Sequence, residues 1–145
     1  MTNYPHHYIV KASGQPQGSV TAEADNVLPI NTAPPVEFGG PGDQWSPETL
    51  LMAAIADCLI LSFRAIARAS KLDWQELTCE AKGVLDRVDG VTRFTEVILT
   101  AMLRIQTEAD QTKAQRLLEK AKQTCLITNS LATECRLDAH VQIDQ

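Results

Sequence analysis

The sequence lacks several features that would point to common classes of binding site. None of the four cysteines forms a CxxC pair with another, and the three histidines lie near the termini, so a tetrahedral zinc site has no local ligand pair to start from. We therefore expect neither a metal nor another cofactor. Basic residues are outnumbered 13 to 18 by acidic ones and form no cluster. The net charge of −5 argues against nucleic acids and anionic membranes as partners.

The chain also lacks an export signal and a long apolar run. Its first ten residues, MTNYPHHYIV, contain no basic segment followed by an apolar stretch. The longest apolar stretch, Leu50 to Phe63, is interrupted by Asp57 and is shorter than the roughly 20 residues that span a bilayer. At 145 residues, 44% of them hydrophobic, the chain fits a single domain over residues 1–145. We expect a cytoplasmic protein whose cysteines are mostly kept reduced.

The N-terminal third contains the turn-forming residues of a β meander. Six of the seven prolines precede residue 46, which excludes a long helix in this region. Three short runs are predicted strands: Tyr8–Ala12, Ser19–Ala24 and Asn26–Ile30. The stretch Ser13–Gly18 is the predicted turn between the first two.

A long central helix is predicted to begin after Ser46. Ser46 as the N-cap, Pro47 at the first helical position and Glu48 in the first turn are three agreeing start signals. From Thr49 to Ile66 almost every residue is apolar or small. This composition predicts burial on most sides of the helix, by a sheet or by a partner subunit.

The remaining segment has the patterns of a hairpin, a helix and a last strand. Two strands, Leu72–Val88 and Val91–Ile105, are joined by a tight Asp89-Gly90 turn. A second amphipathic helix is expected from Glu108 onward, and the alternation over Glu134–Ile143 predicts a strand that closes the sheet. The fold class is therefore α+β.

The four cysteines differ in their predicted surroundings. Cys79 and Cys135 fall on apolar faces of strands, where a free thiol packs as a small hydrophobic group. Cys58 lies in the middle of the central helix, where packing is also its simplest role. Cys125 comes at the end of the second helix and precedes LITNS, a run with little helix signal, so this thiol is expected to be mobile.

Two observations make Cys58 and Cys125 a candidate redox pair. Asp57, Arg64 and Arg68 place ionisable groups near Cys58 on a helix that otherwise has almost none. Thiol redox chemistry needs one thiolate that attacks the oxidant and a second thiol that condenses with the resulting sulfenic acid. Both helices present apolar faces to a core, so the two thiols could meet there.

Three segments together resemble the OsmC/Ohr family of osmotically inducible protein C and organic hydroperoxide resistance proteins: PVEFGGPG, SPETLLMAAIADC and AKQTC. The resemblance runs from about Glu37 onward. It implies an OsmC-like intertwined homodimer in which each central helix is packed between sheets. In that arrangement the active site lies at the subunit interface.

The resemblance also implies roles for three residues. Cys58 would be the peroxidatic residue that attacks a hydroperoxide, and Cys125 would resolve it as a disulfide. A dithiol such as a lipoylated protein, or a small thiol, would then reduce this disulfide. Glu37 falls where family members carry a glutamate that orients an arginine beside the thiolate. The implied function is reduction of organic hydroperoxides or hydrogen peroxide in defence against oxidative stress.

The chain departs from the family pattern at two positions. The family arginine comes from the N-terminal meander or the loop before the helix, yet residues 1–63 contain no arginine, and Leu126 replaces the proline after the resolving cysteine. An isolated thiol in an apolar pocket has a raised pKa. Two non-catalytic alternatives use the same fold, a small-ligand binding protein and a thiol redox sensor. The cations that could replace the arginine, from either subunit, are Lys11, Arg64, Arg68 and Arg93.

Overall fold

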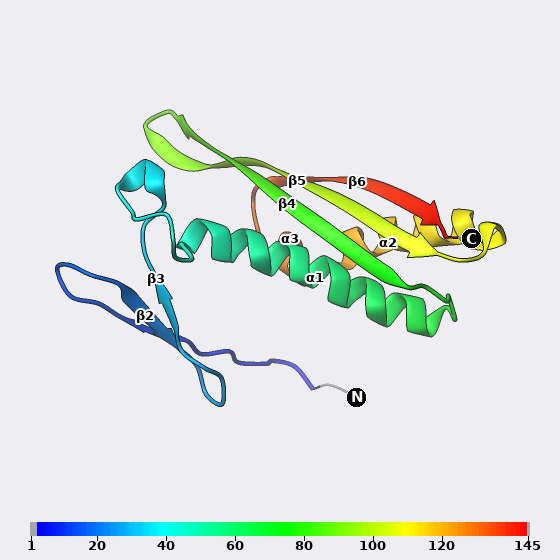
Figure 1. Cartoon of the computed structure of the whole chain (residues 1–145), viewed down its shortest axis with the longest axis horizontal. Coiled ribbons are helices and arrows are strands. Elements are labelled where there is room, and N and C mark those ends of the chain that lie inside the picture. Colours follow the sequence, from blue (N-terminus) through cyan, green and yellow to red (C-terminus); the bar gives the residue numbers. More distant parts are fainter. Residues whose placement is uncertain (1–2, 145) are drawn as a thin grey trace. The chain divides into compact units, whose positions relative to one another are not determined.

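A computed structural model describes residues 3–144, which form an α+β fold with two three-stranded sheets (Figure 1). The residues form two compact units, up to Leu50 and from Leu51 onward, and each is described by itself. The elements are, in chain order, β1 (Lys11–Ser13), β2 (Val20–Glu23), β3 (Ile30–Thr32), η1 (Val36–Phe38), α1 (Pro47–Ala69), β4 (Glu76–Val88), β5 (Val91–Ile105), η2 (Glu108–Asp110), α2 (Gln111–Thr124), α3 (Leu126–Asn129) and β6 (Glu134–Ile143).

The first unit contains the predicted β meander. Strands β1, β2 and β3 pair in sequence order, all antiparallel, with Lys11 opposite Glu23. The predicted position of the third strand was wrong. Asn26 has a φ of 65° and lies in a turn, which ends the extended run, so β3 begins only at Ile30.

The start of α1 agrees with its sequence signals. The Thr49 N–H donates a hydrogen bond to Ser46 Oγ over 3.1 Å, and the Ser46 N–H donates to Thr49 Oγ1 over 2.9 Å. This reciprocal pair satisfies backbone donors that have no partner inside the helix. Pro47 is the first helical residue, as predicted.

The chain itself buries α1 along one stripe. Ile55, Leu59, Phe63 and Ala67 are completely buried and recur every four residues, whereas Leu61 is 55% exposed. Residues 3–144 therefore do not supply the burial on most sides that the sequence predicts. With 23 residues and a mean hydropathy of 2.0 over its most apolar window, α1 also has the length and composition of a membrane span. A core helix of a soluble protein has the same properties, and α1 packs through this stripe on the second sheet.

The second unit is built on the sheet β4-β5-β6, with β5 in the centre. Strands β4 and β5 form the predicted antiparallel hairpin, and β6 pairs parallel to β5. Asp89 and Gly90 have φ angles of 52° and 79°, the left-handed conformation of a two-residue hairpin turn. The predicted bounds of β5 and β6 are confirmed, but β4 begins at Glu76 rather than Leu72.

Helices α1 and α2 cover the same face of this sheet (Figure 1). One core cluster contains Phe63 of α1, Leu103 of β5 and Leu118 of α2, all completely buried. Burial of such side chains is the main favourable contribution to folding. The parallel connection from β5 to β6 passes through α2 and α3, so the end of α2 is fixed beside the sheet.

Gly83 is a testable point of close packing between α1 and the hairpin. A Cβ at this position would lie 2.8 Å from Met52 Sδ and 2.8 Å from Phe94 Cε1. We expect Gly83→Ala to lower the free energy of unfolding by about 1–3 kcal/mol, because an added methyl overpacks the site. Urea denaturation at fixed protein concentration measures this change. Adding Met52→Ala should recover part of the loss, and full additivity of the two substitutions would contradict the assigned clash.

Candidate functional site: a pair of thiols

The structure brings Cys58 and Cys125 together. Cys58 lies on α1 between the buried residues Ile55 and Leu59, and Cys125 follows the last residue of α2. The Cys58 and Cys125 side chains interact, and each shifts the pKa of the other. Both residues are free thiols; Cys125 is completely buried, while Cys58 is partly accessible. An oxidant from solvent therefore reaches Cys58 first.

The backbone around Cys125 holds its sulfur in place. Cys125 has φ −65° and ψ 111°, an extended conformation that ends α2, and the short helix α3 starts at the next residue. The Cys125 carbonyl accepts hydrogen bonds from the Asn129 N–H over 3.0 Å and from Thr128 Oγ1 over 3.1 Å. The run after Cys125 has little helix signal in the sequence, but residues 126–129 form the short helix α3.

Hydrogen bonds make Cys125 the more acidic of the two thiols. Burial by itself raises the pKa of Cys125, but the Cys58 side chain, the Thr128 N–H and the Ile127 N–H lower this pKa below its ordinary value. A thiolate is stabilised by each donor that points at it. The first proton lost by the pair therefore leaves a negative charge mainly on Cys125.

The pKa of Cys58 is raised. Burial is the main cause, and the hydrogen bond to Cys125 raises it further, while the Ile127 N–H and the Ser62 hydroxyl lower it. The Ser62 oxygen lies 3.8 Å from the Cys58 sulfur. The two thiols thus share one proton after the first ionisation, and the proton remains on Cys58 in the resting pair.

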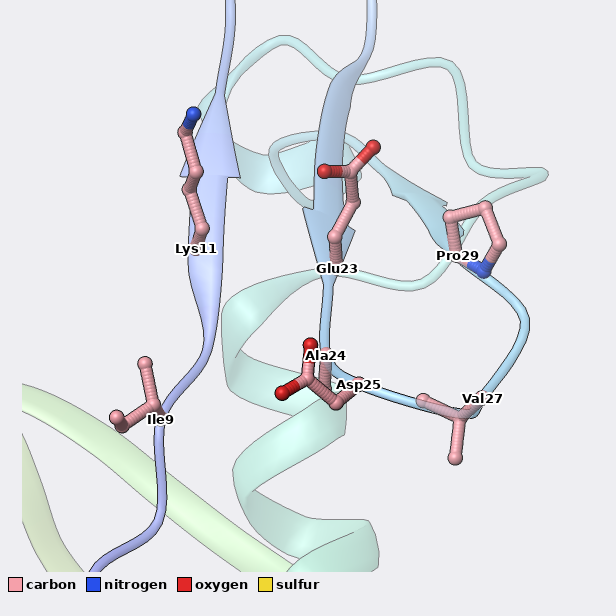
Figure 2. A pocket seen from close by; sticks show the side chains of 7 residues that line it. All are labelled: Ile9, Lys11, Glu23, Ala24, Asp25, Val27 and Pro29. Carbon is pink, nitrogen blue, oxygen red and sulfur yellow. The ribbon is translucent and has the colours of Figure 1, made fainter.

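No lysine or arginine within residues 3–144 is among the main causes of the shift in the pKa of Cys58. Arg64, Arg68 and Arg93 are exposed. Lys11 lies in the first unit, where its β1 position faces Glu23 of β2. These two side chains and Asp25 line a pocket of about 390 Å³, and Figure 2 shows Lys11 and Glu23 extending side by side. Lys11 therefore has an acidic neighbour within its own sheet.

Two glutamates of the first unit differ in their surroundings. Glu37 lies on η1 and is exposed, and its role beside the thiolate stays a prediction. Glu48 has a buried carboxylate oxygen, Oε1, for which the described residues supply no hydrogen-bond partner. It lines a largely apolar pocket of about 330 Å³ that includes Phe38. In the sequence, Glu48 is accounted for by its position in the first turn of a helix. Nothing in the sequence indicates that its Oε1 is buried without a partner among the described residues.

The other two cysteines lie on the face of the sheet that the helices cover. Burial, followed by the charges of Cys125 and Glu80, raises the pKa of Cys79 to about 11. The pKa of Cys135 is raised by burial and by Cys125 and is lowered by Lys122. All three other thiols therefore interact with Cys125. The part of the chain that the structure describes contains no group of three or more His, Cys, Asp or Glu side chains placed to hold a metal ion.

The fold and the thiol pair define a class of small α+β proteins with one cysteine inside a long helix and a second cysteine at the end of another helix. The family model described as OsmC-like protein matches residues 40–140. This match covers more than half of the chain, and the chain therefore belongs to the OsmC-like protein family.

Similar proteins span nearly the whole chain. The uncharacterized protein YmaD of Bacillus subtilis (strain 168) is 28% identical over 95% of this chain and 96% of its own length. An OsmC-like protein of unknown function from Vibrio cholerae has the same fold, with a TM-score of 0.83 and 19% identity over 93% of this chain and 99% of that one. An organic hydroperoxide resistance protein OsmC from Legionella pneumophila has a TM-score of 0.76 and 26% identity over 97% of this chain and 100% of that one.

The proton shared by the two thiols can be tested by titration. Replacing Cys58 with alanine removes a hydrogen-bond donor that lowers the pKa of Cys125, so thiolate formation should begin at a higher pH than in the wild type. Ultraviolet absorbance of thiolates, followed from neutral to alkaline pH, measures this step. In the matched control Cys79→Ala, only the step near pH 11 should disappear. An unchanged first step in Cys58→Ala would show that the thiols do not interact.

Proposed function

We propose that this protein is a thiol-dependent hydroperoxide reductase that acts in defence against oxidative stress. The observation that carries the proposal is the pair of free thiols that interact with each other, one partly accessible and one buried, in a member of the OsmC-like family. The similarity to the Legionella pneumophila hydroperoxide resistance protein supports hydroperoxides as the substrate class.

In the first step Cys58 attacks the substrate. The first ionisation of the pair leaves a thiolate on Cys125, which accepts the remaining proton from Cys58 through their hydrogen bond. The Cys58 thiolate then attacks the terminal oxygen of the hydroperoxide, and the O–O bond breaks. Cys58 becomes a sulfenic acid, and the alkoxide or hydroxide that leaves takes up a proton.

In the second step Cys125 resolves the sulfenic acid. Its sulfur attacks the Cys58 sulfur, a disulfide forms, and water leaves with the proton of Cys125. The existing contact between the two side chains favours this reaction over further oxidation of Cys58. A dithiol, such as a lipoylated protein, or a small thiol then reduces the disulfide, most directly by attack on the accessible Cys58 sulfur. A reducing cytoplasm would supply such thiols.

We infer that Cys125 helps Cys58 to lose its proton, a function that the arginine of the family would otherwise serve. A cation would stabilise the Cys58 thiolate directly, whereas Cys125 would accept the proton of Cys58 as a base. Glu37 remains a candidate for orienting a cation beside the site. Glu48 is a second candidate. Its buried carboxylate oxygen has no hydrogen-bond partner among the described residues, so a cation that donates to it would stabilise it.

We also propose that the protein is a homodimer. Leu61 on α1, and Tyr8 and Ile9 before β1, are exposed by 55%, 90% and 82%. Large apolar side chains on a small protein mark a surface that a partner covers. A second copy of the chain would bury the faces of α1 that the chain itself leaves open.

The hydroperoxide reductase mechanism predicts a defined change of mass. Reduced wild type treated with a slight excess of cumene hydroperoxide should lose two hydrogens as the Cys58–Cys125 disulfide forms. Cys58→Ser should keep its mass, and Cys125→Ser should gain oxygen because its sulfenic acid cannot be resolved. Intact-mass spectrometry distinguishes these products, with Cys79→Ser as the matched control that behaves like wild type. A wild type that loses no hydrogens would rule the mechanism out.

If the protein is a homodimer, its sedimentation coefficient should be that of two chains. Sedimentation velocity at micromolar concentration should give this value, because exposed apolar residues of α1 and of the N-terminal segment become covered. Leu61→Lys should shift the equilibrium toward a monomer, whereas Thr78→Lys, on the exposed face of β4, should leave it unchanged. A monomeric wild type would contradict the proposed assembly.

The raised pKa of Cys58 favours one alternative, a protein that binds a small ligand without redox chemistry. A thiol that stays protonated is a poor nucleophile. In that case cumene hydroperoxide leaves the mass of the reduced protein unchanged, and iodoacetamide alkylates Cys58 only with an apparent pKa at or above the ordinary thiol value of about 8.5. The mass experiment therefore separates the two functions.

A further inference from the structure

Ser62 is a polar residue in the apolar part of α1 that surrounds Cys58. Between Leu50 and Ile66 it is the only residue with a hydroxyl group, and it lies one helical turn after Cys58. Serine is a moderate helix former, and inside a helix its hydroxyl often bonds to the backbone carbonyl one turn earlier. In this protein the hydroxyl has a different partner.

The Ser62 hydroxyl lies against the Cys58 sulfur. Ser62 Oγ and Cys58 Sγ are 3.8 Å apart and form a hydrogen bond in which either atom can be the donor. Side chains of an α-helix lean toward its N-terminus, so a residue covers the turn that precedes it. The contact is therefore built into α1 and needs neither another element nor a second chain.

Both side chains lie at the boundary between the buried stripe and the open face of α1. Leu59 and Phe63, which follow them directly in the chain, are completely buried, whereas Leu61 is 55% exposed. Cys58 and Ser62 are themselves half-buried. A hydrogen bond is stronger in such a partly desolvated place than in water. A molecule that reaches Cys58 from solvent finds the hydroxyl already beside the sulfur.

Ionisation of Cys58 fixes the direction of this hydrogen bond. A thiolate has no proton to donate, so the Ser62 hydroxyl must then be the donor. Burial and Cys125 raise the pKa of Cys58, whereas the Ser62 side chain and the Ile127 N–H lower it. The Ile127 N–H also lowers the pKa of Cys125, so it is shared between the two sulfurs. The Ser62 hydroxyl is directed at Cys58.

We propose that Ser62 is a catalytic residue whose hydroxyl donates a hydrogen bond to the Cys58 thiolate and stabilises it for attack on the hydroperoxide. This inference rests on the proposed function, because the attack is the first step of hydroperoxide reduction. No bond of Ser62 breaks: Cys125 accepts the proton of Cys58, and the hydroxyl keeps its own. As the bond from sulfur to oxygen forms, the negative charge moves to the leaving oxygen and the hydrogen bond to sulfur weakens.

The proposal predicts a characteristic pH profile for Ser62→Ala. At neutral pH its oxidation by cumene hydroperoxide should be about three- to tenfold slower than that of wild type, because less Cys58 is ionised. A thiolate without the hydrogen bond is also more nucleophilic. At alkaline pH, where Cys58 is ionised in both proteins, Ser62→Ala should therefore react at least as fast as wild type. Ser62→Thr, which keeps a hydroxyl, should recover most of the rate at neutral pH.

Two measurements on the reduced proteins test this profile. Rapid quenching and intact-mass spectrometry follow the loss of two hydrogens from neutral to alkaline pH. Iodoacetamide alkylation needs no hydroperoxide, and it is followed in the tryptic peptide Ala12–Arg64, whose only cysteine is Cys58. The apparent pKa of Cys58 should be higher in Ser62→Ala than in wild type. The matched control Ser70→Ala removes a hydroxyl just after the end of α1 and should behave like wild type.

The outcomes separate the role of Ser62 from the proposed function. If Ser62→Ala and wild type share one alkylation profile, the role of Ser62 is overturned and the two-cysteine reductase stands. A rate that falls equally at every pH also overturns it, since a structural defect would act on the thiolate and the thiol alike. If hydroperoxide removes no hydrogens from wild type, the reductase is rejected together with the catalytic role of Ser62.

Discussion

The interaction between the Cys58 and Cys125 thiols depends on two helices that share one face of one sheet. The buried stripe of α1 and the apolar face of α2 both pack on β4-β5-β6, and the parallel return to β6 fixes the end of α2 beside that sheet. Because protein cores are close-packed, neither helix can shift without losing contacts with the strands. The two sulfurs are held together by this packing rather than by local structure.

The interaction between the two thiols helps to offset the effect of burial on the pKa of Cys125. A buried thiol resists ionisation, and no cation within residues 3–144 is among the main causes of the shift in the pKa of Cys58. The Thr128 and Ile127 N–H groups of α3 and the Cys58 side chain lower the pKa of Cys125. The short helix after the second cysteine thus supplies dipoles that offset the effect of burial.

The two remaining thiols, Cys79 and Cys135, have different surroundings. Cys79 and Cys135 face the same side of the sheet, yet their strands and their charged neighbours differ. Cys79 is enclosed by a hairpin beside Glu80, and its pKa rises to about 11. Cys135 is the second residue of the edge strand β6, and its pKa is raised by burial, an effect that Lys122 partly offsets.

The sequence by itself determined the elements whose signals are local. The cap at Ser46, the Asp89-Gly90 turn and the alternating residues of β5 and β6 predicted those elements, because capping, turn geometry and the two-residue period of a strand involve only near neighbours. It misplaced β3 and showed little sign of the short helix α3, since a single short turn has little pattern of its own. Only the tertiary structure decided which of the two thiols has the lower pKa and that the Glu48 oxygen is buried. These properties arise from packing between segments far apart in the chain, and no local pattern encodes them.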